Sequence, residues 1–176
     1  MKFLVSLVMF SLLLNGFAFS QTLIQDSCKK ATVKEPALIY NLCVDSLTQD
    51  PQSRTATTLE GLIIASTKNA EAKAMNVKGI IEHILKGKGY ASIEAELRDC
   101  VGFYDDANDL LNTALASVQS HDYKTANGDF SIALDVPENC EDGIKERNKQ
   151  NSPVSNENNI LFQKILIPLA FNNMLI

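Results

Sequence analysis

The sequence is poor in the side chains that most often carry catalysis. Only two histidines, His83 and His121, occur among its 176 residues, and they belong to different helical segments. Neither stands in the Ser-His-acid or Cys-His arrangement that nucleophilic catalysis requires. His83 follows Glu82 at the polar edge of its helical stripe, which favours a surface histidine. The chain also lacks a glycine-rich phosphate-binding loop. These absences predict a protein that is not an enzyme and that needs no cofactor.

Basic residues are also scarce relative to acidic ones. The chain has 16 lysines and arginines against 21 aspartates and glutamates, a formal net charge of −5. Nucleic-acid binding depends on neutralising phosphates with basic side chains, so this balance argues against a nucleic-acid partner. The adjacent acids Asp105 and Asp106 do not form a glycosidase pair either. Neighbouring residues of a helix point about 100° apart, whereas the two carboxylates of such a pair share one site.

No apolar run reaches the ~20 residues that a membrane-spanning helix needs. The run "FLVSLVMFSLLL" follows the positively charged start Met1-Lys2, and small residues lead up to Ser20. This is the pattern of a secretory signal peptide. We expect residues 1–20 to be removed, which leaves one domain over 21–176 with no membrane attachment. The predicted location is the apoplast or cell wall, with the vacuole as the alternative.

The four cysteines, Cys28, Cys43, Cys100 and Cys140, all lie in the expected mature domain. An even cysteine count in a secreted chain indicates disulfides. Three pairings are open in principle. Cys28–Cys43 with Cys100–Cys140 is favoured, because each bond then closes a loop between consecutive helical segments. A zinc site is the competing interpretation, but the cysteines lack the short spacing of zinc ligands, so no metal is expected.

Apolar residues at helical spacing fill 57–86 and 92–119, and no segment shows the alternation of a strand. Two further helices are expected, one beginning after Asp122 and one after Ser155, which is the candidate N-cap of the last helix. Pro168 is expected to kink or end that last helix. The pattern predicts an all-α fold, an up-and-down four-helix bundle.

The segments that flank these helices are expected to be shorter. Residues 26–33, with Asp26 or Ser27 as N-cap, and 35–47 predict a helical hairpin in front of the bundle. The stretch "VPENCEDG" (136–143) is expected to turn the chain before a short helical turn that holds Cys140.

The stretch "DCVGFYDDANDLL" (99–111) combines a buried and an acidic side. At helical spacing Cys100, Tyr104, Ala107 and Leu111 share one face, while the aspartates point elsewhere. We interpret this segment as a bundle helix fixed by a cysteine on its inner side. Its outer acids are either solvated or part of a binding surface.

Several motifs together resemble the plant invertase/pectin methylesterase inhibitor family. They are "CKKA…YNLCVDSL", "DPQSRTA…LEGL", "DCVGFYDDA", "HDYKTAN…SIAL", "CEDGIKE" and "SPVSNEN", spread over nearly the whole mature chain. The chain is similar, more narrowly, to the pollen-type members, which include a plane-tree pollen allergen. The resemblance implies a four-helix bundle behind a helical hairpin and disulfides that pair in chain order. It also implies an inhibitor that binds a carbohydrate-processing enzyme and occludes its substrate cleft.

The resemblance leaves the target enzyme open. Family members that inhibit acid invertase present Pro-Lys-Phe at the entry to the helix that here begins after Asp122, where this chain reads "DYKT". Lys124 is kept, while the proline and the phenylalanine are absent. The contacting acids of pectin methylesterase inhibitors correspond to Asp106, Asp109, Asp122 and Asp142. Pectin methylesterase is therefore slightly favoured over acid invertase as the partner.

A protein of another class remains as an alternative. Apolar helical secreted domains can open an interior cavity for a small ligand, so a carrier or storage protein is the second hypothesis. A C-terminal lipid-anchor signal is disfavoured, because Gln163 and Lys164 interrupt the apolar tail. The sequence does not indicate an oligomeric state.

Overall fold

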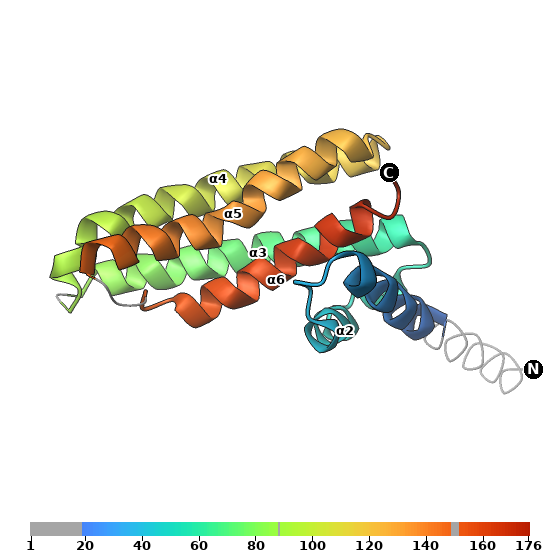
Figure 1. Cartoon of the computed structure of the whole chain (residues 1–176), viewed down its shortest axis with the longest axis horizontal. Coiled ribbons are helices and arrows are strands. Elements are labelled where there is room, and N and C mark those ends of the chain that lie inside the picture. Colours follow the sequence, from blue (N-terminus) through green and yellow to red (C-terminus); the bar gives the residue numbers. More distant parts are fainter. Residues whose placement is uncertain (1–18, 88, 149–151) are drawn as a thin grey trace, which may run out of the picture.

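The computed structural model describes residues 19–87, 89–148 and 152–176, and over these ranges the regular structure is helical, without a strand. Four long helices, α3 (Leu59–Leu85), α4 (Glu94–Gln119), α5 (Tyr123–Asn148) and α6 (Ser155–Asn172), run side by side as a bundle (Figure 1). A helical hairpin packs at one end of the bundle. The predicted four-helix bundle with an N-terminal hairpin is confirmed.

Helix α3 begins at a side-chain cap and ends before a glycine. The Thr58 hydroxyl accepts a hydrogen bond from the Gly61 N–H at 3.0 Å, and Glu60 places a negative charge in the positive first turn. Its middle buries three alanines, Ala65, Ala70 and Ala74. Small side chains let neighbouring helices approach closely, and α3 packs against both α4 and α6.

Helix α4 follows a short 3-10 turn, η2 (Ala91–Ile93), and carries the seam expected from its spacing. Cys100, Tyr104, Ala107 and Leu111 are all buried, whereas the three aspartates between them are exposed. The period of the sequence therefore places the inner and outer faces of this helix correctly.

The turn predicted at 136–143 is wrong, because helix α5 spans these residues. It runs unbroken through Pro137, and "CEDGIKE" is part of it rather than a separate helical turn. A proline inside a helix removes one backbone hydrogen bond. Here Ala133, Cys140 and Ile144 bury one continuous stripe on both sides of the proline, so packing along the full length of α4 outweighs the lost bond.

Helix α6 also differs from expectation at its start. Ser155 is not the N-cap but the first helical residue, after Val154, and its hydroxyl donates to the Ser152 carbonyl at 2.9 Å and to Glu141 Oε2 at 2.6 Å. Pro168 does not end the helix, which continues to Asn172. The last turns of α6 are buried on all sides, so neighbouring helices hold them in place.

The hairpin consists of an N-terminal helix, described over 19–34, and α2 (Tyr40–Gln49). Asp26 and Ser27 lie inside the first helix and do not cap it, and the second helix starts at Tyr40, later than predicted. The hairpin is followed by a 3-10 turn, η1 (Ser53–Thr55). It docks on α6 through Gln163, whose side-chain amide accepts from the Ile39 N–H and donates to the Ala37 carbonyl, both at 2.9 Å.

The expected signal peptide lies almost wholly outside the described residues. Its predicted end, Ser20, falls in the N-terminal helix, where the buried Ser20 hydroxyl donates to the Ser53 carbonyl at 3.1 Å. Within the described part of the chain, no helix is long and apolar enough to cross a membrane.

Both predicted disulfides are present. Cys28 bonds to Cys43 within the hairpin, with their Cα atoms 5.9 Å apart. Cys100 bonds to Cys140 between α4 and α5, with a Cα distance of 5.1 Å. One covalent bond therefore closes the hairpin and the other joins two helices of the bundle.

Candidate target-binding surface

Two of the predicted contact residues, Asp106 and Asp109, lie on the outer side of α4. Both side chains are exposed. They are three residues apart, on the side of the helix that faces away from the buried seam of Cys100 and Tyr104. Their neighbour Asp105 points toward α3 and forms an ion pair of 2.5 Å with Lys78. Asp106 and Asp109 therefore face solvent from a helix that a disulfide and a buried seam hold in place.

Two further predicted residues, Asp122 and Lys124, lie at the junction of α4 and α5. Asp122 caps α5: its carboxylate accepts the Thr125 N–H at 3.1 Å and the Thr125 hydroxyl at 2.8 Å. These two hydrogen bonds to the charged form lower the pKa of Asp122 below its ordinary value. Lys124 is exposed in the first turn of α5, where the helix dipole disfavours a cation.

The fifth predicted residue, Asp142, lines a hollow between α5 and α6. The hollow has a volume of about 350 Å³, and its other polar lining residues are Glu138, Glu141, Asn158 and Asn159. Asp142 and Glu138 are exposed, while Asn158 is buried. The rim of the hollow is therefore acidic.

A chain of hydrogen bonds forms the floor of this hollow and joins three helices. The Tyr104 hydroxyl of α4 donates to Asn158 Oδ1 of α6, and Asn158 Nδ2 donates to Glu141 Oε1 of α5 at 2.6 Å. Ser155 donates to the other Glu141 oxygen. Burial raises the pKa of the Tyr104 hydroxyl, and the negative charge of Glu141 raises it further, so Tyr104 remains a donor.

The sequence prediction missed Glu138, Glu141 and Asn158. Glu141 sits within the motif "CEDGIKE", but Asn158, which bonds to it in the hollow, comes from a helix that begins more than ten residues further along the chain. Only the packing of α6 against α5 brings them together. The sequence signals were the motif "CEDGIKE", which was interpreted as a separate turn, and the motif "SPVSNEN", which ends at Asn158.

The five predicted residues do not form one cluster. With a rise of 1.5 Å per residue, Asp109 is about 15 Å from the end of α4, and Asp142 is about 30 Å along α5 from Asp122. They make three groups: the outer side of α4, the α4–α5 turn, and the α5–α6 hollow. A single partner that contacts all three must cover most of the length of the bundle. Among the described residues, no group of His, Cys, Asp and Glu side chains is arranged to hold a metal ion.

Comparison with solved structures supports the fold. The chain superimposes on a crystal structure of a pectin methylesterase inhibitor from Arabidopsis thaliana with a TM-score of 0.62, covering 86% of this chain and 98% of that one at 24% identity. A mutant form of a pectin methylesterase inhibitor from Arabidopsis gives a TM-score of 0.68 over 81% of this chain and 96% of that one, at 23% identity. At these sequence identities, the structural match shows that the fold is shared and nothing beyond the fold.

Comparison of sequences gives a closer result. Pectinesterase inhibitor 12 of Arabidopsis thaliana is 64% identical over 175 residues, which cover 99% of this chain and 100% of that protein. A protein of Platanus orientalis named "Putative invertase inhibitor" is 38% identical over 159 residues, 90% of this chain and 93% of its own length. The family model described as plant invertase/pectin methylesterase inhibitor matches residues 22–171. The chain therefore belongs to the plant invertase/pectin methylesterase inhibitor family, whose members inhibit enzymes and are not themselves catalysts.

Proposed function

We propose that this protein is a secreted inhibitor of pectin methylesterase. The observation that carries the proposal is the 64% identity with Pectinesterase inhibitor 12 along the full length of both chains. The α4–α5 junction supports it, since Lys124 is flanked there by Tyr123 and Thr125 instead of the proline and phenylalanine of the invertase-inhibitor tripeptide. Secretion is proposed from the N-terminal segment, whose pattern is that of a cleaved signal peptide.

The proposed mechanism is occlusion by a preformed surface. The Cys100–Cys140 bond and the Tyr104–Asn158–Glu141 chain fix α4, α5 and α6 relative to one another. The acids on these helices therefore need little ordering when a partner binds, which lowers the entropic cost of association. The bundle covers the entrance to the substrate cleft and takes no part in chemistry.

Acid invertase is the second candidate target. It is favoured by the name of the Platanus relative and by Lys124, which is exposed at the position of the family's tripeptide lysine. The comparisons do not favour the carrier hypothesis, since the matched family and the relatives named above are inhibitors.

A paired inhibition assay tests the proposal. The protein is collected from the medium of expressing cells, where N-terminal sequencing should begin at Gln21, and is titrated against a pectin methylesterase and an acid invertase. We expect inhibition of the methylesterase.

The double change Asp106→Ala with Asp109→Ala should weaken this inhibition at least tenfold. The melting temperature should change little, because both side chains are exposed and surface changes usually cost under about 0.5 kcal/mol. Lys124→Ala should have a small effect.

The matched control removes two exposed acids from the hairpin, Asp26→Ala with Asp45→Ala, which changes the net charge equally at a distance from α4. It should inhibit as the wild type does. If Lys124→Ala abolishes inhibition while the α4 double variant is silent, the target is acid invertase. A wild-type protein that inhibits neither enzyme refutes the proposed function.

A further inference from the structure

The α4–α5 turn has a histidine where helix geometry favours a glycine. The His121 N–H donates to the Val118 carbonyl and the Asp122 N–H to the Ser117 carbonyl, both at 2.9 Å. This pair of bonds is a Schellman motif, whose penultimate residue takes the left-handed conformation and is usually glycine. His121 has φ 60° and is the one non-glycine residue with positive φ in the described part of the chain. The backbone thus accepts a conformation that disfavours a side chain.

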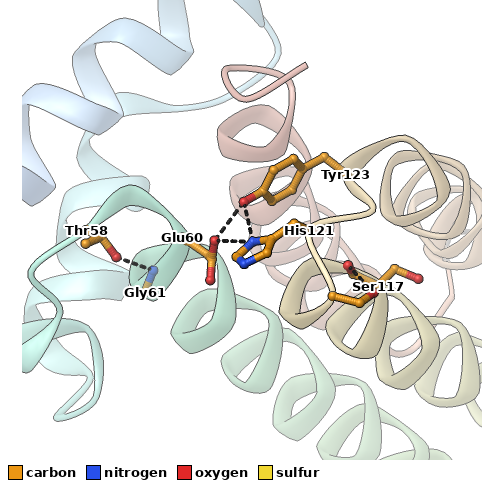
Figure 2. Close-up of polar contacts among 7 residues, drawn as sticks. Thr58, Glu60, Gly61, Ser117, His121 and Tyr123 are labelled. Carbon is orange, nitrogen blue, oxygen red and sulfur yellow. Dashed lines mark hydrogen bonds and ion pairs between the residues drawn. The ribbon is translucent and has the colours of Figure 1, made fainter.

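The side chain of His121 explains why a glycine would not serve. Its Nδ1 lies 3.0 Å from Glu60 Oε2 and 3.0 Å from the Tyr123 hydroxyl. The Tyr123 hydroxyl donates to the same Glu60 oxygen at 2.7 Å. Figure 2 shows the three side chains pointing toward one another, with Glu60 coming from the first turn of α3, His121 from the α4–α5 turn and Tyr123 from the start of α5. We call these three residues the turn clamp.

The turn clamp holds the chain on both sides of Asp122. His121 precedes it and Tyr123 follows it, and both contact one carboxylate of a different helix. Tyr123 is held a second time, since its carbonyl accepts a hydrogen bond of 2.8 Å from the Asn172 side chain of α6. The hydrogen bond to Glu60 also raises the pKa of Tyr123, so its hydroxyl remains a donor. The positions of Asp122 and Lys124 therefore depend on contacts from α3 and α6 as well as on their own helix.

We propose that Glu60, His121 and Tyr123 are positioning residues that fix the turn bearing Asp122 and Lys124 in its target-binding geometry, and that protonation of His121 tightens this hold. The inference rests on the proposed inhibitory function. A neutral imidazole gives Glu60 at most a hydrogen bond, whereas a protonated imidazole gives it an ion pair. Target affinity at this end of the bundle consequently increases in acidic medium.

Three other polar side chains lie at this turn. Besides Glu60 of α3 and Tyr123 of α5, the same turn bears Asp122 and Lys124, which have opposite charges, and α6 contributes the uncharged amide of Asn172. Glu60 is the carboxylate in contact with Nδ1, so it is the partner whose removal should decouple the turn.

The first experiment uses the free protein and needs no target. Amide resonances of α3 near Glu60, those of Gly61 and Leu62, are followed by NMR together with the ring of His121 as the pH is changed from about 8 to about 5. We expect them to share the midpoint of the His121 ring in the wild type and to lose this response in His121→Gly. The glycine suits the left-handed backbone, so the variant should fold, and His121→Asn provides a second one. If the resonances of these α3 amides do not change with pH in the wild type, the turn clamp is refuted.

The second experiment measures binding to the inhibited enzyme at about pH 5 and about pH 7.5. Ratios of variant to wild-type Kd are compared, because titration of the target cancels in them. Glu60→Gln and His121→Gly should each weaken binding about three- to five-fold at the lower pH, the scale of an exposed ion pair, and little at the higher pH. The control His83→Gln changes the other histidine, which is exposed on α3, and should leave both values unchanged.

The outcomes separate the two claims. If His121→Gly binds with wild-type affinity at both values of pH, the positioning role is refuted while the inhibitor proposal stands. If the wild type inhibits no enzyme, the proposed function fails, and the NMR titration still decides whether the clamp exists.

Discussion

At the scale of single residues, Glu71 is a side chain whose environment does not suit its charge. It lies half-buried on α3, and within the described residues its buried Oε1 has no hydrogen-bond partner. Burial raises the pKa of Glu71, and the charge of Lys68 offsets this only in part. Above that raised pKa the folded protein contains a poorly solvated carboxylate, and protonation removes the cost as the pH falls. Glu71 therefore favours the folded state more in acid than at neutrality.

This sign gives a prediction for Glu71→Gln. The variant should melt about 1–3 °C above the wild type near neutral pH, since the amide has no charge to desolvate. The difference should vanish toward about pH 4, where the wild-type side chain is itself protonated. Thermal melting followed by circular dichroism across this range measures both. The exposed acid change Glu146→Gln is the control, and a gain that persists unchanged in acid contradicts the explanation.

At the scale of the elements, the two disulfides constrain different things. Cys28–Cys43 spans 15 residues inside the hairpin, while Cys100–Cys140 spans 40 and joins α4 to α5. On the loop-entropy model, bonds of these lengths contribute about 3 and about 4 kcal/mol to stability, respectively. The hairpin keeps its contacts with Gln163 of α6 when its own bond is lost.

We therefore expect unequal losses from removing each bond. Cys100→Ser with Cys140→Ser should lower the melting temperature more and should speed amide exchange along α4 and α5. Cys28→Ser with Cys43→Ser should speed exchange mainly in the hairpin, because the bundle does not depend on that bond. Paired substitutions avoid free thiols that could mispair. Equal melting losses in the two variants would argue against this ranking.

The elements also show what the sequence could and could not predict. The seam of α4 was predictable, because a helix with one buried face shows its period in a single stretch of sequence. The continuity of α5 through Pro137 was not, since a local rule that proline breaks helices competes with packing along a neighbour that the sequence does not display. The same holds for Ser155, whose hydroxyl serves Glu141 of another helix.

The candidate site divides in the same way. Asp106 and Asp109 could be placed outward from helical spacing alone, and Asp122 could be recognised as a cap from its position before α5. The acidic hollow and the turn clamp could not, because Glu141 meets Asn158, and Glu60 meets His121, only after the helices have packed.

At the scale of the whole molecule, net charge and the distribution of acids determine how a partner approaches. The chain has a net charge of −5, and its proposed contact residues are predominantly acidic. Such a surface attracts a basic partner over distances that salt shortens to about 8–10 Å.

Complex formation with the target should therefore weaken as salt rises, mainly through a slower association rate. Surface plasmon resonance at about 0.05 M and about 0.5 M NaCl measures the two rate constants. The α4 variant that lacks Asp106 and Asp109 should show a shallower dependence than the wild type. Salt-independent binding would indicate an apolar interface and remove the aspartates from the contact.

The position of α6 outside both disulfides has a consequence for aggregation. Three of its side chains donate hydrogen bonds to other elements: Asn158 to Glu141 at the floor of the hollow, Gln163 to the hairpin, and Asn172 to the start of α5. All four cysteines precede α6, so neither disulfide ties this helix to the rest of the protein. A molecule whose α6 has detached is still cross-linked, yet it exposes the apolar stripes that α6 covers, which makes it prone to aggregate. The disulfides therefore do not protect the protein from aggregation that begins with the release of its last helix.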